Sequence, residues 1–155
     1  MYLAVLVANT ILHLSNLNPG GWVELQDYDN LIRSDDGTAT EKDIAVQWVI
    51  YAAQAAAKLN REARPGLYLE QWAKDAGFIN VKHRVFKIPV NGWPRDPKFK
   101  LVGEWMRENV TGGLDGMSMR LMCDVLGWTE AEVHVFLAGV RKQLNDRSFH
   151  GYWNW

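Results

Sequence analysis

Aromatic side chains make up most of the large apolar surface in this sequence. The chain carries eight tryptophans, five tyrosines and five phenylalanines among its 155 residues. Rings of this size have to be covered by packing. Together with a hydrophobic content of 48% and only five prolines, they predict a folded globular chain and exclude a collagen-like or wholly disordered one. The length predicts that residues 1–155 form a single unit.

The charges are balanced, with 17 basic and 18 acidic residues. Residues 1–60 hold three basic and seven acidic residues, a charge of −4, and residues 61–155 hold fourteen and eleven, a charge of +3. Neither half is basic enough to predict nucleic-acid binding. The six basic residues between Lys82 and Lys100 fall on alternate strand and loop positions, which favours a solvated face. Cys123 is the single cysteine, which suits a reducing compartment, so we expect the cytoplasm or nucleus.

An apolar run opens the chain and extends through Leu14. It is shorter than the ~20 residues that a bilayer-spanning helix needs. No Lys or Arg precedes Arg33, so the run lacks the basic start of a secretory signal. We therefore expect a buried helix in this region and no membrane partner.

Local patterns predict alternating strands and helices. Asn18–Gly21 has turn composition, and the last helix has a capping box, because Thr129 is followed by Glu132 three residues later. Thr40 is expected to be the N-cap of an earlier helix. The predicted strands are 22–28, 79–86 and a closing strand from Tyr152, the predicted loop is 29–39, and the predicted helices are 40–60, 68–76, 98–110, 114–126 and 129–145.

Common catalytic and nucleotide-binding motifs are absent from the sequence. It contains no G-x-G-x-x-G, G-x-x-x-x-G-K-[ST], G-x-S-x-G or H-E-x-x-H. The four histidines have no i, i+4 pair, so no metal site is predicted. The adjacent acids Asp35 and Asp36 stand in a glycine-containing loop, where they either bind a cation or basic ligand or are simply solvated.

Six segments, taken in order, carry a resemblance to a known family. The most specific are the run from Gly92 to Pro97, a later Leu-Gly-Trp and a His-x-Tyr-Trp ending, whereas Pro-Gly-Gly before a strand is shared by many class I methyltransferases. The six segments are residues 17–27, 34–38, 76–81, 87–98, 125–128 and 147–153. Over residues 17–155 the chain resembles the C-terminal half of fungal S-adenosylmethionine-dependent methyltransferases of the type that regulates secondary metabolism.

The resemblance implies an α/β architecture, a partial class I methyltransferase (Rossmann-like) fold that lacks the N-terminal strands and is rich in cap and insertion helices. By this resemblance residues 22–28 are the fifth strand and the helix from Thr40 is a cap over the active-site mouth. Residues 81–87 would be an outer strand, and the helices between 98 and 145 an insertion before an antiparallel closing strand.

The resemblance also implies S-adenosylmethionine as cofactor and a small-molecule or protein methyl acceptor. The family's cofactor-binding glycine-rich loop and ribose-binding acid are not present, so no cofactor-binding residue is assigned and the chain is expected to be inactive alone. The missing strands would leave an apolar edge beside residues 22–28, which predicts self-association or a protein partner. The alternatives are a non-catalytic protein-interaction module that uses this edge and a carbohydrate-binding surface based on the tryptophans.

Ligands of open α/β sheets lie beyond the carboxyl ends of the strands, so the end of strand 22–28 is expected to face the substrate, and residues of three other segments are expected to line the substrate mouth. Asp27 would orient a substrate group or bond to a turn, and His150 would act as a base near neutral pH. Packing in the core is the alternative for Trp48. The full set of substrate-side candidates is Gln26, Asp27, Tyr28, Trp48, Trp93 and His150.

Overall fold

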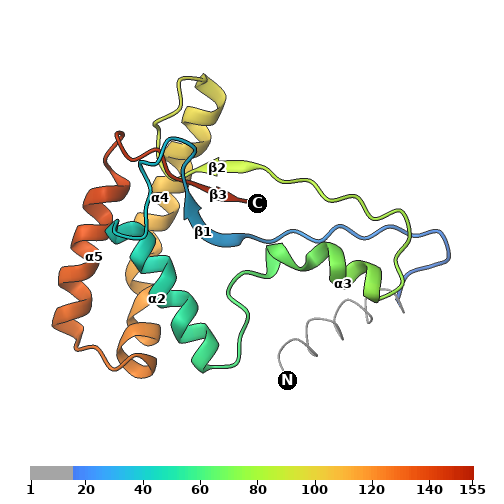
Figure 1. Ribbon diagram of the computed structural model, residues 1–155, viewed down its shortest axis with the longest axis horizontal. Coiled ribbons are helices and arrows are strands. Elements are labelled where there is room, and N and C mark those ends of the chain that lie inside the picture. Colours follow the sequence, from blue (N-terminus) through green and yellow to red (C-terminus); the bar gives the residue numbers. More distant parts are fainter. Residues whose placement is uncertain (1–15) are drawn as a thin grey trace.

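The computed structural model describes residues 16–155, so the helix expected near the start lies outside the described residues. A layer of three long helices stands at one end of the molecule, next to a small sheet, and two extended segments run from the sheet toward the other end (Figure 1). The elements are β1 (Asp29–Arg33), α2 (Ile44–Lys58), η1 (Pro65–Leu67), α3 (Leu69–Asp75), β2 (Lys87–Pro89), α4 (Pro97–Met119), η2 (Arg120–Val125), α5 (Glu130–Leu144) and β3 (Tyr152–Asn154). The expected mixed α/β character is confirmed.

The sheet has three strands in the order β1-β3-β2, and β3 is antiparallel to both neighbours. Tyr152 of β3 lies opposite Arg33, the last residue of β1, and opposite Pro89, the last residue of β2. β1 and β2 are therefore parallel, and their carboxyl ends lie together. The antiparallel closing strand from Tyr152 is confirmed, and the helical region expected between residues 98 and 145 is occupied by α4, η2 and α5.

The expected positions of the first two strands are wrong. The first strand is β1, inside the segment expected to be a loop, and residues 22–28 precede it without a ladder. Residues 79–86 likewise precede β2. The strand-like alternation is real, because Val23 and Leu25 are half-buried while Glu24 and Gln26 are exposed. A ladder also needs a neighbour, and within residues 16–155 none pairs with 22–27.

The helix starts follow local capping. α2 begins at Ile44 with Asp43 as N-cap, and not at Thr40. The Thr40 hydroxyl and backbone N–H donate to the Asp43 carboxylate at 2.7 and 2.8 Å, so Thr40 fixes the side chain of the N-cap residue. The Thr129 and Glu132 capping box of α5 is confirmed.

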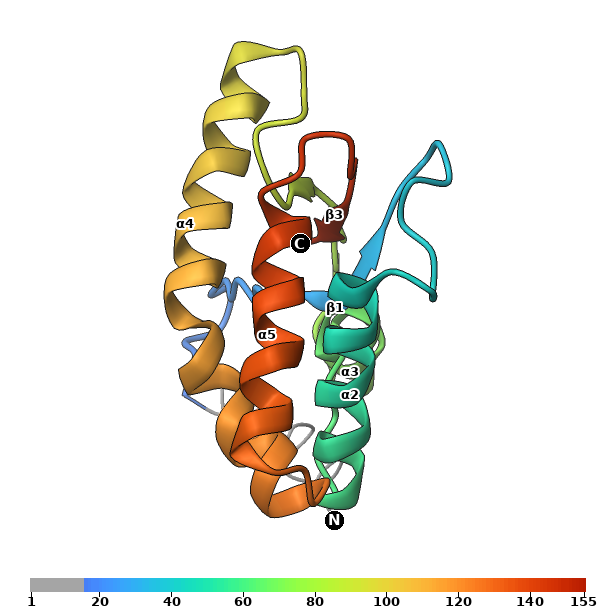
Figure 2. The ribbon, with the colours of Figure 1, turned by 90° about the vertical axis from the view of Figure 1, so that its left-hand side faces the viewer.

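The two helices expected over 98–110 and 114–126 are largely one. α4 runs unbroken through Gly112 and Gly113 and continues into the π-helical turn η2. Glycine weakens a helix without ending it, and the buried Val110 and Leu114 on either side hold α4 against its neighbours. α2, α4 and α5 lie side by side (Figure 2). No helix within residues 16–155 is both long and apolar enough to cross a membrane.

The core lies between these helices and the sheet. Trp48 of α2 is 6% exposed, and its indole Nε1 donates to the hydroxyl of the buried Ser118 at 2.8 Å. The other large core side chains include Ile32, Val49, Val90, Leu114, Met122, Val133, Leu137, Leu144, Phe149 and Trp153. This packing places β1, β2 and β3 firmly against the helix layer, and with them the loops at their ends.

Candidate site at the carboxyl ends of β1 and β2

The new position of β1 moves the carboxyl end of the first strand from Tyr28 to Arg33. The chain segments that meet at this end of the sheet are 34–38 after β1, 90–93 after β2 and 149–151 before β3. Ligands of open α/β sheets bind beyond the carboxyl ends of the strands. The candidate site therefore lies among these three segments.

Asp36 and His150 form the centre of the site. Oδ2 of Asp36 lies 2.5 Å from Nδ1 of His150. Thr38 holds both residues in place. Its backbone N–H and its hydroxyl donate to Oδ1 of Asp36 at 3.1 and 2.7 Å, and its hydroxyl oxygen accepts a hydrogen bond from the backbone N–H of His150 at 3.0 Å. Gly37, which lies between Asp36 and Thr38 in the sequence, has a φ of +79°, which a residue with a side chain rarely adopts. The carboxylate and the ring are thus held by the backbone as well as by each other.

The contact has a definite electrostatic effect. The hydrogen bond from His150, together with those from Thr38, lowers the pKa of Asp36 to about 2. A carboxylate at Nδ1 assigns the N–H to that nitrogen in the neutral ring and leaves Nε2 as the proton acceptor. The His150 side chain is 37% exposed, so a ligand in solution can reach the ring.

Trp93 borders the same ring. Its ring centroid lies 5.0 Å from that of His150, with a tilt of 34° between the planes. The indole Nε1 donates to the Gly151 carbonyl at 2.9 Å, and the Trp93 N–H donates to Oδ1 of Asn91. Asn91 is buried and its amide donates to the carbonyls of Asp146 and Phe149. Trp93 is therefore positioned by a buried polar residue.

A second charged group stands beside Asp36. Nζ of Lys87 lies 2.8 and 2.6 Å from the two oxygens of Asp35, and the Tyr152 hydroxyl donates to Asp35 at 2.8 Å. Lys87 also lies 4.5 Å from the centroid of the Tyr152 ring. Hydrogen bonding by Lys87 lowers the pKa of Asp35, and the same bond raises the pKa of Lys87. Asp35 is therefore paired with groups of β2 and β3, whereas Asp36 is paired with His150 in the segment before β3.

The structure separates the six sequence candidates into three places. Trp93 and His150 meet at the site. Trp48 is a buried core residue whose indole bonds to Ser118. Gln26 and Asp27 precede β1 and lie at its amino end, where Gln26 bonds to Glu24 and Oδ1 of Asp27 accepts the next backbone N–H.

Tyr28 also lies at the amino end of β1 and packs edge-on against Trp155, with centroids 4.2 Å apart. Burial, helped by the neighbouring charge of Asp27, raises the pKa of Tyr28. Its hydroxyl therefore stays protonated to higher pH than an exposed tyrosine. This position is remote from the carboxyl ends of the strands.

Sequence reasoning missed the pairing of Asp36 with His150. The two residues are 114 positions apart, and no local pattern reports such a contact. The only signal was the spacing of Asp36, Gly37 and Thr38, which is typical of an Asx turn.

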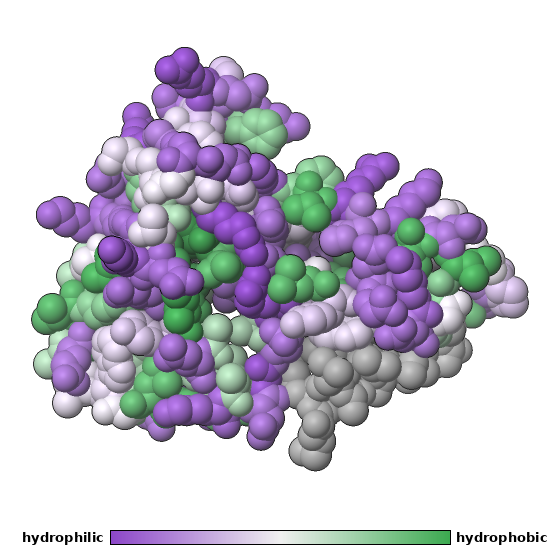
Figure 3. Space-filling model, viewed as in Figure 1, coloured by the Kyte–Doolittle hydropathy of each residue, from purple (hydrophilic) through white to green (hydrophobic). Residues whose placement is uncertain are grey.

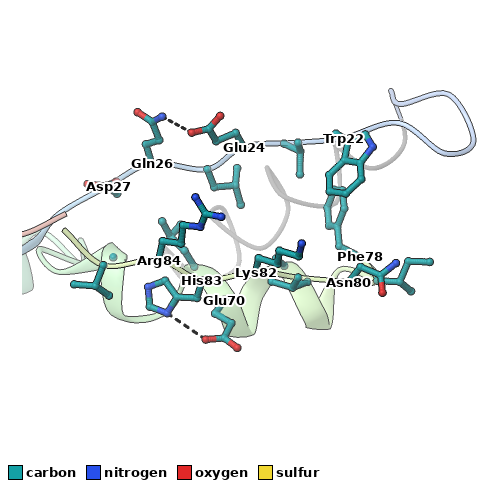
Figure 4. A pocket seen from close by; sticks show the side chains of 18 of the residues that line it. Trp22, Glu24, Gln26, Asp27, Glu70, Phe78, Asn80, Lys82, His83 and Arg84 are labelled. Carbon is teal, nitrogen blue, oxygen red and sulfur yellow. Dashed lines mark hydrogen bonds and ion pairs between the residues drawn. The ribbon is translucent and has the colours of Figure 1, made fainter.

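A cavity of about 890 Å³ lies at the amino ends of β1 and β2. It is formed by the extended segments 17–27 and 77–86, with α3 beneath them (Figure 4). Glu24 and Gln26 point away from the opposite segment, and His83 bonds to Glu70 of α3 at 3.2 Å. Apolar side chains reach the surface over these segments (Figure 3). Trp22 is 80% exposed there.

The residues at the carboxyl ends of the strands do not fit the methyl donor expected from the resemblance. Polar side chains of the loop after β1 are hydrogen-bonded to other groups of the protein: the Ser34 hydroxyl bonds with the backbone of Ala39, and Asp36 bonds with Thr38 and His150. No glycine-rich turn follows β1 or β2. Among residues 16–155 there is also no group of three His, Cys, Asp or Glu side chains suited to a metal.

Known proteins resemble the chain over most of its length. The probable methyltransferase tdiE of Emericella nidulans is 37% identical over 139 residues, covering 90% of this chain and 44% of the relative. The methyltransferase pytC of Aspergillus terreus is 37% identical over 136 residues, covering 88% and 42%. Over about 90% of its length this chain is homologous to part of these fungal methyltransferases. The secondary metabolism regulator LAE1 of Cochliobolus heterostrophus is 32% identical over 142 residues, covering 90% of the chain and 46% of the relative.

The resemblance that the sequence motifs indicated is thus confirmed. The chain spans less than half the length of these curated relatives. No protein-family model and no solved structure matches it.

Proposed function

We propose that this methyltransferase relative is the substrate-side and cap part of a class I, Rossmann-like, S-adenosylmethionine-dependent enzyme. The methyl donor is held by residues other than 16–155, and the 155-residue chain does not turn over alone. The length of the relatives supports this proposal, since more than half of each has no counterpart here. The sheet order supports it too, because the antiparallel β3 lies between two parallel strands.

The contact between Asp36 and His150 at the carboxyl ends of β1 and β2 supports the proposal that the methyl acceptor binds there. A hydroxyl or N–H acceptor loses a proton when it is methylated. Nε2 of His150 is placed to hold that proton, and the Asp36 carboxylate stabilises the resulting imidazolium. The indole of Trp93 lies beside the same ring and offers a flat surface to a planar acceptor.

The experiment is a titration of the ¹⁵N-labelled chain with p-cresol and with indole as planar acceptor probes. We expect shifts of the His150 ring and Trp93 indole signals, with the Trp105 indole unchanged, because Trp105 lies on α4 and is 70% exposed. Trp93→Leu removes the flat surface and should abolish the shift at His150. Equal shifts at Trp93 and Trp105 would refute an acceptor site here.

The second candidate is a protein-interaction module, and one observation favours it. The extended segments expose Trp22 and Ile79, which are 80% and 85% exposed, on a surface that also lines the cavity. Exposed apolar patches of this kind mark protein-interaction sites. Light scattering on an eluting size-exclusion peak tests it, because a sharp monomer at all concentrations argues against self-association through this surface.

A further inference from the structure

The two extended segments flank the line along which β3 runs. Residues 22–28 continue β1 backward and residues 81–86 continue β2 backward (Figure 1). Phe86 and Trp155 exchange both backbone hydrogen bonds, at 2.8 and 2.9 Å, and the Trp155 ring touches Tyr28. The backbone pairing on the β2 side therefore continues one residue past β3, and on the β1 side Trp155 packs against Tyr28.

Beyond Trp155 the two segments keep the geometry of strands without a partner between them. Within residues 16–155, neither 22–27 nor 79–85 makes a hydrogen bond from its backbone to another backbone group. Unpaired backbone groups in extended segments are a template for strand addition. The cavity begins at Asn154 and Trp155 and runs between the segments, with Leu69 and Ala73 of α3 among its lining residues.

The two pairings predict the same register for a strand in this space. Asp29 lies opposite Asn154, and Phe86 pairs with Trp155. The next residue along the line of β3 therefore falls between Asp27 on one side and Val85 on the other. The residue four positions further along this line would lie between Val23 and Val81. On the second side, Asn80, with a φ of +57°, ends the extended segment. Both segments thus offer the same length, about five residues.

We propose that this cavity binds an extended polypeptide segment of about five residues that enters beside Trp155, runs collinear with β3 and pairs antiparallel with residues 23–27 and 81–85. α3 covers one face of the added strand. The occupant is a β-strand and not a small molecule, because the available contacts are two rows of backbone donors and acceptors. Successive side chains of a strand point to opposite faces, so a sequence of alternating character would place one set of side chains against α3.

The register makes a residue-specific prediction. Hydrogen-bonded pairs alternate in an antiparallel ladder, so the pair at Phe86 places the amides of Arg84 and Lys82 toward the added strand. The pairing at Asp29 does the same for the amides of Asp27, Leu25 and Val23. The amides of Glu24 and Gln26 point the other way and stay open to exchange.

The experiment is residue-resolved hydrogen exchange on the 155-residue chain and on two versions lengthened after Trp155. One carries the tail Val-Thr-Val-Thr-Val, and the matched control carries Pro-Thr-Pro-Thr-Pro, which lacks the N–H groups of alternate residues and disfavours a paired strand. We expect exchange at Arg84, Lys82, Asp27, Leu25 and Val23 to slow at least about tenfold with the valine tail only. Exchange in α5 serves as the internal reference.

Two results would overturn the proposal. One is equal exchange at these five amides in all three proteins. The other is protection in the untailed chain that grows with protein concentration, which would assign the cavity to a second copy of the chain. The measurement uses neither methyl donor nor acceptor, so its outcome is independent of the proposed enzymatic role.

Discussion

Oδ2 of Asp36 lies 2.5 Å from Nδ1 of His150, although 114 residues separate them. The contact joins the loop after β1 to the segment before β3, which are brought together because Tyr152 pairs opposite the ends of β1 and β2. Any loosening of the sheet at this end would separate the pair. The contact is therefore a sensitive reporter of the candidate site.

Removal of the imidazole should raise the pKa of Asp36. In the folded chain this pKa is about 2, against an ordinary value of 3.8, chiefly because of the hydrogen bond from His150. A lowered carboxylate pKa stabilises the fold above about pH 4, and that contribution is lost as the pH falls toward 2. In His150→Ala the pKa should rise without reaching 3.8, because the bonds from Thr38 remain. Carboxyl ¹³C titration measures it, and an unchanged midpoint would show that the pair does not form.

Replacement of Trp48 by Phe should destabilise the chain, because it leaves the buried hydroxyl of Ser118 without its hydrogen-bond donor. The change removes the indole donor to Ser118, which lies 1% exposed. An unsatisfied buried polar group costs about 1–3 kcal/mol. The double variant Trp48→Phe with Ser118→Ala should recover part of that loss in urea unfolding. Additive losses in the double variant would mean that the two residues are not coupled.

Two glycines of α4 should respond in opposite directions to alanine. A Cβ at Gly103 would overlap the carbonyl oxygen of Asn91, and that backbone cannot move without disturbing the Asn91 hydrogen bonds. Gly103→Ala should therefore lower the free energy of unfolding by about 3 kcal/mol. Gly112 meets open space, so Gly112→Ala should raise it by about 0.5–1 kcal/mol. Thermal melts of both variants test this, and a loss at Gly112 would contradict the continuous α4.

Asp29 should matter more to stability than a surface acid of the same kind. Its side chain is 4% exposed and contacts Arg33 and Arg64, each at 2.5 Å. Asp29→Asn should cost about 1–3 kcal/mol, less than a wholly buried pair because both arginines are about one-third exposed. The control is Glu70→Gln, which breaks an exposed pair with Lys74 and should cost less than about 1 kcal/mol. Equal losses in the two variants would place Asp29 among ordinary surface acids.

Local sequence signals predicted the helices better than the strands. The capping box at Thr129 and the turn at Gly77, with a φ of +96°, act within a few residues, so a short window of sequence contains them. The strand register depends on which segments pair. Alternation in 22–28 gave the correct burial of Val23 and Leu25 but carried no information about a partner.

The same reason explains the candidate site. His150 and Trp93 each lie in a sequence motif that carries the resemblance, and the structure brings the two rings together. For Asp36 the sequence predicts only solvation or binding of a cation or basic ligand, because its actual partner lies in a distant segment. The error in strand position then placed Gln26 and Asp27 at the wrong end of β1. A contact between distant segments depends on the topology of the fold, which the local patterns of a single sequence do not predict.

Calorimetric titration of the 155-residue chain with S-adenosylmethionine tests the central claim, that these residues supply the acceptor side and not the methyl-donor pocket. We expect no saturable heat at millimolar donor concentrations. Saturable binding with micromolar affinity would contradict it.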